Sequence, residues 1–216
     1  MAQWERARSD EQKQERIEEI FSVARKLLLA QPFDTIRLAT IAKELSFTRA
    51  NLYKYFQSKE EIYSSLLAQE IEIFAQTLKD KVDQQQPAQT ADAFIDFWTT
   101  HLSQHQAMLM LLSVAGHILE KNISDTVLLH SKKRIVASSM QWTMPSIHYF
   151  FPRWDASRVQ ESLDLLVVLA NGLYSFCGLN SSQKKLLCDH GLEGMVSQGF
   201  DTEYRQILQK IGFGRN

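Results

Sequence analysis

Helix breakers are rare along this chain, and this constrains its fold more than any other feature. The 216 residues include four prolines and eight glycines. Long intervals therefore contain no breaker, and no segment shows the sustained alternation of apolar and polar residues typical of a half-buried strand. The sequence predicts a nearly all-α protein. The expected helices span residues 10–30, 37–45, 49–55, 59–84, 88–104, 106–120, 124–150, 155–179, 182–198 and 201–211.

Two prolines suggest how these helices are grouped. Pro32 ends the first helix, and Pro87 cannot continue the helix that precedes the glutamine run at residues 84–86. The expected architecture is a small unit of three helices, a connecting helix that begins at residue 59, and a C-terminal helical bundle. The corresponding domains are residues 1–58 and 59–216.

The charge balance limits where a nucleic acid could bind. Composition is ordinary for a globular protein, with 44% hydrophobic and 23% charged residues and a net charge of -1. A nucleic-acid site must therefore be a local patch. Between residues 36 and 59 the local charge is +4, because Glu44 is the one acid against five basic residues. These are Arg37, Lys43, Arg49, Lys54 and Lys59.

Two short helices are expected within residues 38–56, where the positive charge is concentrated. Leu38, Ile41 and Leu45 recur at helical spacing in the first of them. In the second, Thr48 suits the N-cap, and Leu52 and Phe56 lie four residues apart as a buried stripe. Two such helices joined by a few residues form a helix-turn-helix, whose second helix enters the DNA major groove. The turn should lie at residues 45–47, with Ser46 left-handed and Phe47 filling the gap between the helices.

Nine residues on or beside these helices are expected at a DNA surface. They are Arg37, Thr48, Arg49, Ala50, Asn51, Tyr53, Lys54, Tyr55 and Lys59. The first turn of the second helix lies nearest the base edges, where Arg49 can bond guanine and Asn51 adenine, although either can equally bond phosphate. The later residues suit phosphate contacts. Taken singly, each basic residue could equally be ordinary solvated surface.

The order of residues in this region resembles the N-terminal domain of TetR-like transcriptional repressors, over roughly residues 12–63. The resemblance is carried by Phe33–Thr35, Ile41–Ala42, Thr48, Leu52–Phe56 and Ser58–Glu61. It implies core positions for Leu52 and Phe56, phosphate contacts for Tyr53 and Lys59, and a base-reading turn at 48–51. The family usually has glycine where Ser46 stands and a small aliphatic residue where Phe47 stands.

The resemblance also implies a mode of action. Proteins similar to this one bind double-stranded DNA as two-fold homodimers, at operators with two pseudo-palindromic half-sites. A small molecule that enters the C-terminal bundle changes the separation of the two DNA-reading heads. The expected function is therefore a ligand-responsive transcriptional regulator, a repressor that its effector releases from the operator.

The C-terminal half contains a stripe that would suit a dimer interface. The helix at 155–179 has apolar residues at helical spacing, and it could form an intermolecular four-helix bundle with residues 182–198. The expected interface residues are Val159, Leu163, Leu166, Val167, Ala170 and Tyr174. The alternative is that this stripe packs entirely inside one chain.

A candidate effector pocket lies on residues 94–150, where aromatic residues, Met and His recur every three to five positions. Such residues suit a largely apolar ligand, although an aromatic stripe is also typical of a solid core. The expected lining is Trp98, His101, His105, Met108, Leu112, His117 and Trp142. His101 and His105 could share a metal at this spacing, but no convincing third ligand lies nearby, so we expect neither metal nor cofactor.

Other functional classes find little support in the sequence. We expect no enzyme, because there is no phosphate loop, nucleophile elbow or specific metal signature. A helical enzyme with an unrecognised site, or an interaction module, stays the alternative. Cys177 and Cys188 should be free thiols in a reducing compartment. The most apolar run, Leu163–Ala170, is too short to span a bilayer, so we expect a cytoplasmic protein without membrane contact.

Overall fold

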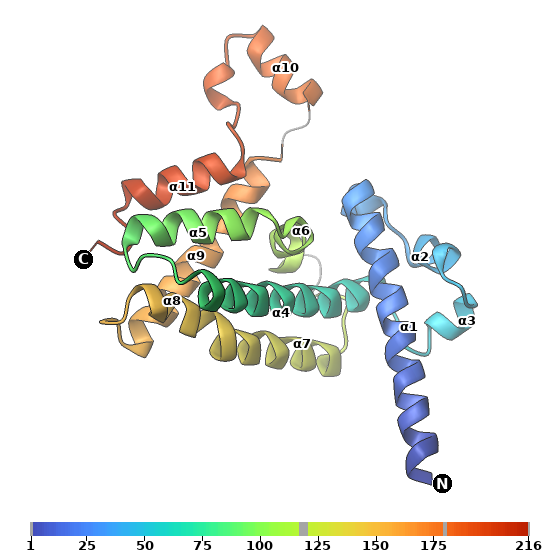
Figure 1. Cartoon of the computed structure of the whole chain (residues 1–216). Coiled ribbons are helices and arrows are strands. Elements are labelled where there is room, and N and C mark those ends of the chain that lie inside the picture. The colour runs from blue at the N-terminus through green and yellow to red at the C-terminus, as the bar shows by residue number, and fades with distance from the viewer. Residues whose placement is uncertain (1, 117–120, 179–180, 216) are drawn as a thin grey trace. The chain divides into compact units, whose positions relative to one another are not determined.

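The computed structural model describes residues 2–116, 121–178 and 181–215, and every regular element within them is a helix (Figure 1). The prediction of an all-α fold is confirmed. The α-helices are α1 (Ala2–Ala30), α2 (Leu38–Glu44), α3 (Arg49–Leu52), α4 (Lys59–Gln85), α5 (Ala91–Ser103), α6 (Gln106–Val114), α7 (Asp125–Ser138), α8 (Met144–Phe150), α9 (Ala156–Phe176), α10 (Ser181–Asp189) and α11 (Phe200–Lys210). The shorter turns are two 3-10 turns, η1 (Phe33–Thr35) and η4 (Glu193–Met195), and a π-helical turn, η3 (Ser139–Thr143).

Three of the expected helices beyond residue 100 differ from those observed. The helix expected at 182–198 ends at Asp189, because Gly191 turns left-handed with φ of 71° and the Leu192 N–H then bonds the Leu187 carbonyl at 2.9 Å. The π-helical turn η3 interrupts the helix expected at 124–150. The α-helix expected at 106–120 ends at Val114, and residues 117–120 lie outside the described residues.

The chain divides into two compact units. Unit 1 comprises residues 1–69 and 114–132, and unit 2 comprises residues 70–113 and 133–216. The boundary predicted between residues 58 and 59 therefore falls inside unit 1. The start of α4 belongs with α1, α2 and α3, and so does the segment that leads into α7.

The core of unit 1 holds α3 against α1 and the start of α4. Phe56 follows α3, and its ring centroid lies 5.9 Å from that of Phe21 on α1. Tyr63 on α4 is fully buried, and its hydroxyl donates to the Ala24 carbonyl at 3.1 Å. Leu52 of α3 is also fully buried. This packing anchors the single turn of α3 by its apolar side and leaves its other sides free.

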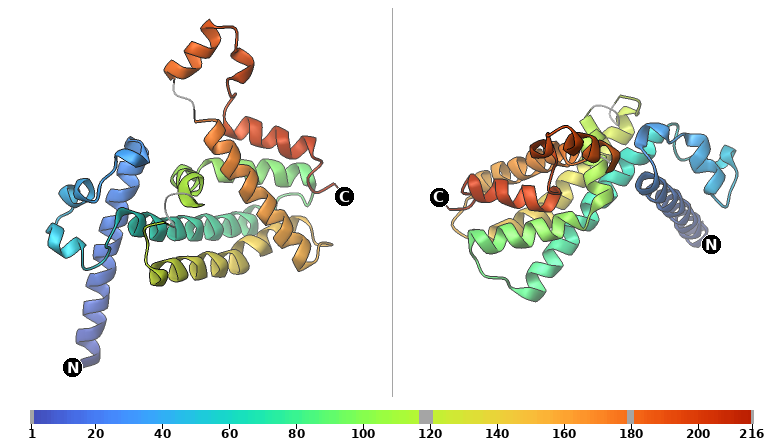
Figure 2. Two further views of the ribbon diagram at one scale, coloured as in Figure 1. Left: turned by 180° about the vertical axis from the view of Figure 1, so that it is seen from behind. Right: turned by 90° about the horizontal axis from the view of Figure 1, so that it is seen from above.

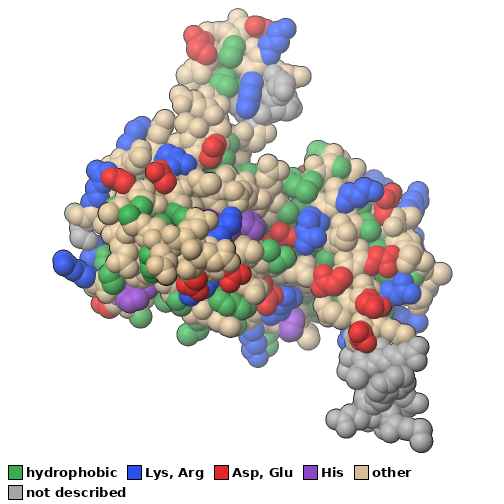
Figure 3. Space-filling view, in the orientation of Figure 1, with side chains coloured by type: hydrophobic (Ala, Val, Ile, Leu, Met, Phe, Trp, Pro, Cys, Tyr) green, Lys and Arg blue, Asp and Glu red, His purple; other side chains and the backbone are tan. Residues whose placement is uncertain are grey.

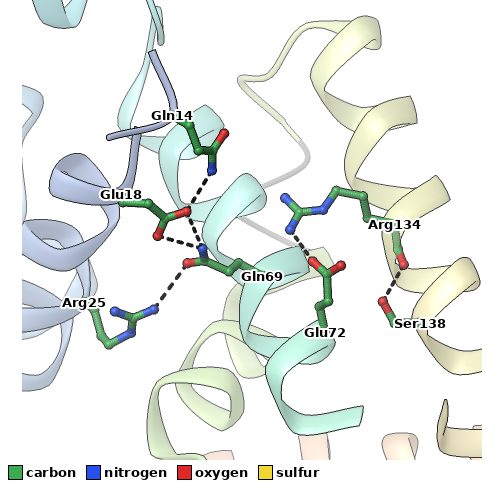
Figure 4. Close-up of polar contacts among 7 residues, drawn as sticks. All are labelled: Gln14, Glu18, Arg25, Gln69, Glu72, Arg134 and Ser138. Atoms are coloured by element: carbon green, nitrogen blue, oxygen red, sulfur yellow. Dashed lines mark hydrogen bonds and ion pairs between the residues drawn. The ribbon is translucent and has the colours of Figure 1, made fainter. Parts of the chain in front are cut away.

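Polar contacts also join helices within each of the two units (Figure 4). In unit 1, Gln69 on α4 donates to Glu18 and accepts from Arg25, both of which lie on α1. In unit 2, Arg134 on α7 forms an ion pair with Glu72 on α4. Gln69 thereby ties the part of α4 in unit 1 to α1, and Glu72 ties the part in unit 2 to α7.

The core of unit 2 is aromatic and joins α5, α8, α9 and α11 (Figure 2). Phe94 on α5 lies at its centre, with ring centroids 5.1–5.6 Å from four other aromatic rings. These are Trp98, Phe150, Phe151 and Phe213. By contrast, α10 stands away from the other helices of this unit in Figure 1 and in the left view of Figure 2.

Candidate DNA-binding surface

The turn at residues 48–51, which is predicted to contact DNA bases, lies at the start of α3. Thr48 is extended, with φ of -70° and ψ of 151°, and its carbonyl accepts from the Asn51 N–H at 2.9 Å. Its side chain makes no capping bond, so the hydroxyl stays available. Thr48, Arg49 and Ala50 are exposed and Asn51 is half-buried. Because Leu52 is buried beneath them, the first turn of α3 presents polar groups to solvent.

The helix predicted at 49–55 is α-helical only from 49 to 52. Beyond it, Lys54 N–H donates to the Asn51 carbonyl at 3.1 Å and Tyr55 N–H to the Leu52 carbonyl at 3.0 Å, which is 3-10 spacing. This tighter turn lets the chain enter the Ser58 cap of α4. Lys54 is exposed and Tyr55 is half-buried.

Arg49 and Tyr53 form a pair on the surface of α3. The Arg49 guanidinium donates to the Tyr53 hydroxyl at 3.0 Å and lies 5.5 Å from the centroid of its ring. A guanidinium has five N–H donors, so this bond leaves donors for a base edge or a phosphate. The pair restricts where the Arg49 side chain can point.

Two further basic residues flank α3 in the sequence. Lys59 is half-buried, and its ammonium donates to the Phe33 carbonyl at 3.1 Å and lies 4.4 Å from the centroid of the Phe33 ring. It keeps two of its three donors. Arg37 is exposed at the N-cap of α2. The visible face of unit 1 carries both signs of charge (Figure 3).

The turn between α2 and α3 differs from the prediction. Ser46 is not left-handed, since among the described residues Gln86, with φ of 43°, is the one non-glycine residue with positive φ. Leu45 ends α2 in an extended conformation instead. The backbone N–H and the hydroxyl of Ser46 donate to the carboxylate of Glu19 on α1, a residue that the sequence did not single out. Phe47, predicted to fill the gap between the helices, is half-buried, and its ring centroid lies 6.4 Å from that of Tyr55.

Family models match both parts of the chain. Residues 20–66 match the model described as "Bacterial regulatory proteins, tetR family", and residues 68–215 match "Tetracyclin repressor-like, C-terminal domain". A search of the curated proteins gave no match.

The chain belongs to the TetR family.

As a TetR-family member, the protein is a DNA-binding transcriptional regulator, and its family acts by binding DNA rather than by catalysis. The N-terminal match runs from residue 20, within α1, to residue 66, within α4, so the exposed turn at 48–51 lies in the matched DNA-binding domain. Across the described ranges, no helix is both long enough and apolar enough to cross a membrane.

In the TetR-like C-terminal domain, the predicted effector residues contribute mostly to a packed core. Trp98, His101 and Met108 are buried, and His105, Leu112 and Trp142 are half-buried. His117 lies outside the described residues. Phe74 on α4 joins three of them, with ring centroids 5.5 Å from Trp98, 4.9 Å from His101 and 5.3 Å from His105. Among the described residues, Trp142 makes no ring contact with this group.

His101 is held as a neutral ring in this core. Its Nε2 lies 3.0 Å from the Phe74 carbonyl and its Nδ1 lies 3.2 Å from the Lys81 ammonium. Because a carbonyl accepts and an ammonium donates, the proton sits on Nε2. Burial, together with the charges of His105 and Lys81, lowers the pKa of His101 to about 4, although the bond to the Phe74 carbonyl acts to raise it. Within the described chain, no three His, Cys, Asp or Glu residues converge as metal ligands.

A cleft of about 290 Å³ lies elsewhere in the TetR-like C-terminal domain, between η4 and α11. Phe176, Met195, Glu203, Ile207 and Lys210 line part of it. None of the residues predicted to contact an effector lies on it.

The residues predicted for the dimer interface fall on two faces of α9. Val159, Leu163, Leu166 and Ala170 are buried within the chain itself, as the alternative for this stripe supposed. A side chain already covered by its own chain has no surface left for a partner. Tyr174 is half-buried, 5.6 Å from the Phe200 ring, and Val167 is 38% exposed.

Proposed function

We propose that this TetR-family protein represses transcription as a homodimer, and that a small, largely apolar ligand releases it from a pseudo-palindromic operator. The observation that carries the DNA-binding part is the first turn of α3. It exposes Thr48, Arg49 and Ala50 above the buried Leu52, in a segment with a local charge of +4.

Within this proposal, α3 divides the work between bases and phosphates. Arg49 and Asn51 read base edges from the first turn, because the N-terminal residues of a recognition helix lie deepest in the groove. Tyr53, Lys54 and Lys59 contact phosphates. The hydroxyl of Tyr53 already holds Arg49 in the free protein, so one contact can orient the other.

The dimer face that we propose is the exposed side of α9. Leu165, Val168 and Phe176 are 41%, 67% and 56% exposed and recur at helical spacing. Gly172 continues this stripe, and a Cβ there would meet nothing within 4 Å, so a second helix could approach closely. Val167 lies at its edge. Hydrophobic side chains also lie on the lobe that contains α10 (Figure 3), where Leu186 is 58% exposed. Val168→Asp should convert the dimer to a monomer in sedimentation, since it places a charge in the apolar stripe.

The structure leaves little free space at the proposed effector site. The ring contacts of Phe74 fill the space beside Trp98 and His101, so a ligand there must displace aromatic side chains. Entry of a ligand should therefore change the fluorescence of Trp98. A panel of apolar compounds, tested on the wild type and on Trp98→Phe, would identify such a ligand by a signal lost in the variant.

The DNA-binding proposal is tested with an operator selected from random duplexes by the wild-type protein. Lys59→Ala should weaken binding to all sequences alike and reduce the slope of log Kd against log salt by about one. Asn51→Ala should instead relax the preference at one base pair, by a factor of roughly 5 to 150. Lys210→Ala, on α11, is the matched control and should leave both properties unchanged.

One control and one outcome bear on this assignment directly. Because the Lys59 ammonium also bonds the Phe33 carbonyl, melting temperatures are compared to separate weaker binding from unfolding. If neither the lysine nor the asparagine variant alters operator binding, α3 is not the reading element.

A further inference from the structure

The turn that precedes α3 is held from outside the helix-turn-helix by a carboxylate of α1. Both oxygens of Glu19 accept from Ser46, one from the backbone N–H at 2.5 Å and the other from the hydroxyl at 2.9 Å. Ser46 belongs neither to α2 nor to α3, so its N–H has no helical carbonyl to bond. Glu19 supplies the acceptor that the turn lacks.

A second side chain of α1 completes this bracket. Arg16 lies one turn before Glu19, and its guanidinium donates to the Ser46 hydroxyl at 3.0 Å and to the Glu19 carboxylate at 3.3 Å. It also lies 4.9 Å from the centroid of the Phe47 ring, a cation–π contact. Two residues of α1 therefore contact both residues of the turn. Burial acts to raise the pKa of Glu19, but the bonds from Ser46 and Arg16 outweigh it and leave the pKa below its usual value.

These contacts reach the element that faces DNA. Arg49 follows Ser46 by three residues, and α3 itself is a single turn anchored at its far end by Leu52 and Phe56. Its N-terminal end therefore takes its direction from the turn. Binding groups must be held to within about 0.5 Å of their productive positions, so a small movement of this turn would misplace them.

The same contacts contribute little to folding. The side chains of Arg16 and Glu19 are 45% and 29% exposed, and ion pairs open to solvent add little to stability. Removing them should change where α3 points far more than whether unit 1 folds.

We propose that Glu19 and Arg16 are positioning residues of the DNA-reading head, which fix the turn at Ser46 and Phe47 and thereby set the sequence preference of α3. The inference rests on the proposed role of α3 as the reading element. It assigns part of the sequence specificity to a helix that need not touch a base.

The test uses the full-length protein and the operator selected by the wild type. Glu19→Gln keeps the size of the side chain but loses the charge and one acceptor, and Ser46→Ala removes the hydroxyl that this acceptor binds. Glu15→Gln makes the same charge change one turn earlier on α1, where the side chain is exposed. Each variant is measured on the operator and on duplexes with one base pair changed, and its melting temperature is recorded.

We expect Glu19→Gln to reduce discrimination against the changed base pairs about tenfold, while its melting temperature falls by no more than about 2–4 °C. Glu15→Gln should keep the wild-type discrimination. The double variant Glu19→Gln with Ser46→Ala should lose little more discrimination than Glu19→Gln alone, because both substitutions remove the same bond.

Two results would overturn the inference while leaving the proposed function intact. One is a Glu19→Gln protein with wild-type discrimination. The other is equal weakening on all duplexes together with a large loss of melting temperature, which would make Glu19 a purely structural residue. If Asn51→Ala also leaves discrimination unchanged, the proposed role of α3 fails first.

Discussion

The hydroxyl of Tyr204 offers a sharp test of how unit 2 is held together. Tyr204 on α11 is fully buried, and its hydroxyl donates to the Leu166 carbonyl on α9 at 2.8 Å. The same oxygen accepts from the Trp98 indole N–H on α5 at 3.2 Å. One atom therefore bonds two other helices. Burial raises the pKa of Tyr204 and keeps this hydroxyl protonated.

Tyr204→Phe removes that atom and leaves its two partners in different situations. The Leu166 carbonyl lies inside α9 and keeps its helical N–H, so the lost bond there costs about 1 kcal/mol. The Trp98 N–H is buried and loses its acceptor, which costs a further ~1–3 kcal/mol. The free energy of unfolding should fall by about 2–4 kcal/mol in total.

The measurement is urea unfolding followed by far-UV circular dichroism at one protein concentration. Tyr63→Phe in unit 1 is the matched control, because its hydroxyl has one bond to a helical carbonyl and should cost about 1 kcal/mol. In a Trp98→Phe background no N–H is orphaned, so Tyr204→Phe should also cost about 1 kcal/mol there. Equal costs for the two tyrosine variants, with no coupling to Trp98, would refute this reasoning.

Three other sites give independent predictions. Thr99 is fully buried, and its hydroxyl has no hydrogen-bond partner within the described chain, so Thr99→Val should raise the melting temperature by about 2–4 °C in calorimetry. His101 binds a proton near pH 6.5 when unfolded but only near pH 4 when folded. The free energy of unfolding should therefore fall by about 3 kcal/mol as the pH is lowered from 6.5 to 4. His101→Gln should flatten that dependence in denaturation curves recorded across the pH range. At Gly214, with φ of 75°, a Cβ would lie 2.5 Å from the Phe151 ring, whereas at Gly212, with φ of 66°, it meets nothing within 4 Å. Gly214→Ala should therefore cost at least about 1 kcal/mol more than Gly212→Ala in urea unfolding.

The sequence was informative wherever local rules decide the structure. The interval without breakers between Pro32 and Pro87 contains α2 and α4 close to their predicted bounds, and α3 begins where it was predicted, at Arg49. The four-residue spacing of Leu52 and Phe56 correctly placed both in the core. These features depend on residues within one or two helical turns, so periodicity and capping chemistry are sufficient to find them.

Features that depend on distant residues could not be found this way. Glu19 and Ser46 lie 27 residues apart, and nothing in either local sequence marks them as partners. The stripe on α9 illustrates the same limit, since Leu163 and Leu166 are spaced as buried residues, whether their own chain or a second copy covers them. Periodicity identifies an apolar face but not the surface that packs on it.

The residues that surround α3 show why the reading head is larger than the helix-turn-helix motif. The Glu61 carboxylate accepts from the Gln57 N–H at 2.7 Å, between α3 and α4, and from the Ser124 hydroxyl at 2.9 Å, directly before α7. Ser58 also donates to the Asn122 carbonyl at 2.8 Å. Glu61 is 5% exposed, so water cannot readily replace a bond that it loses. A displacement of residues 122–124 must therefore either break these bonds or move the start of α4, and the segment between α3 and α4, with it. For a regulator, this makes a segment beyond the DNA-binding motif part of the unit that faces DNA.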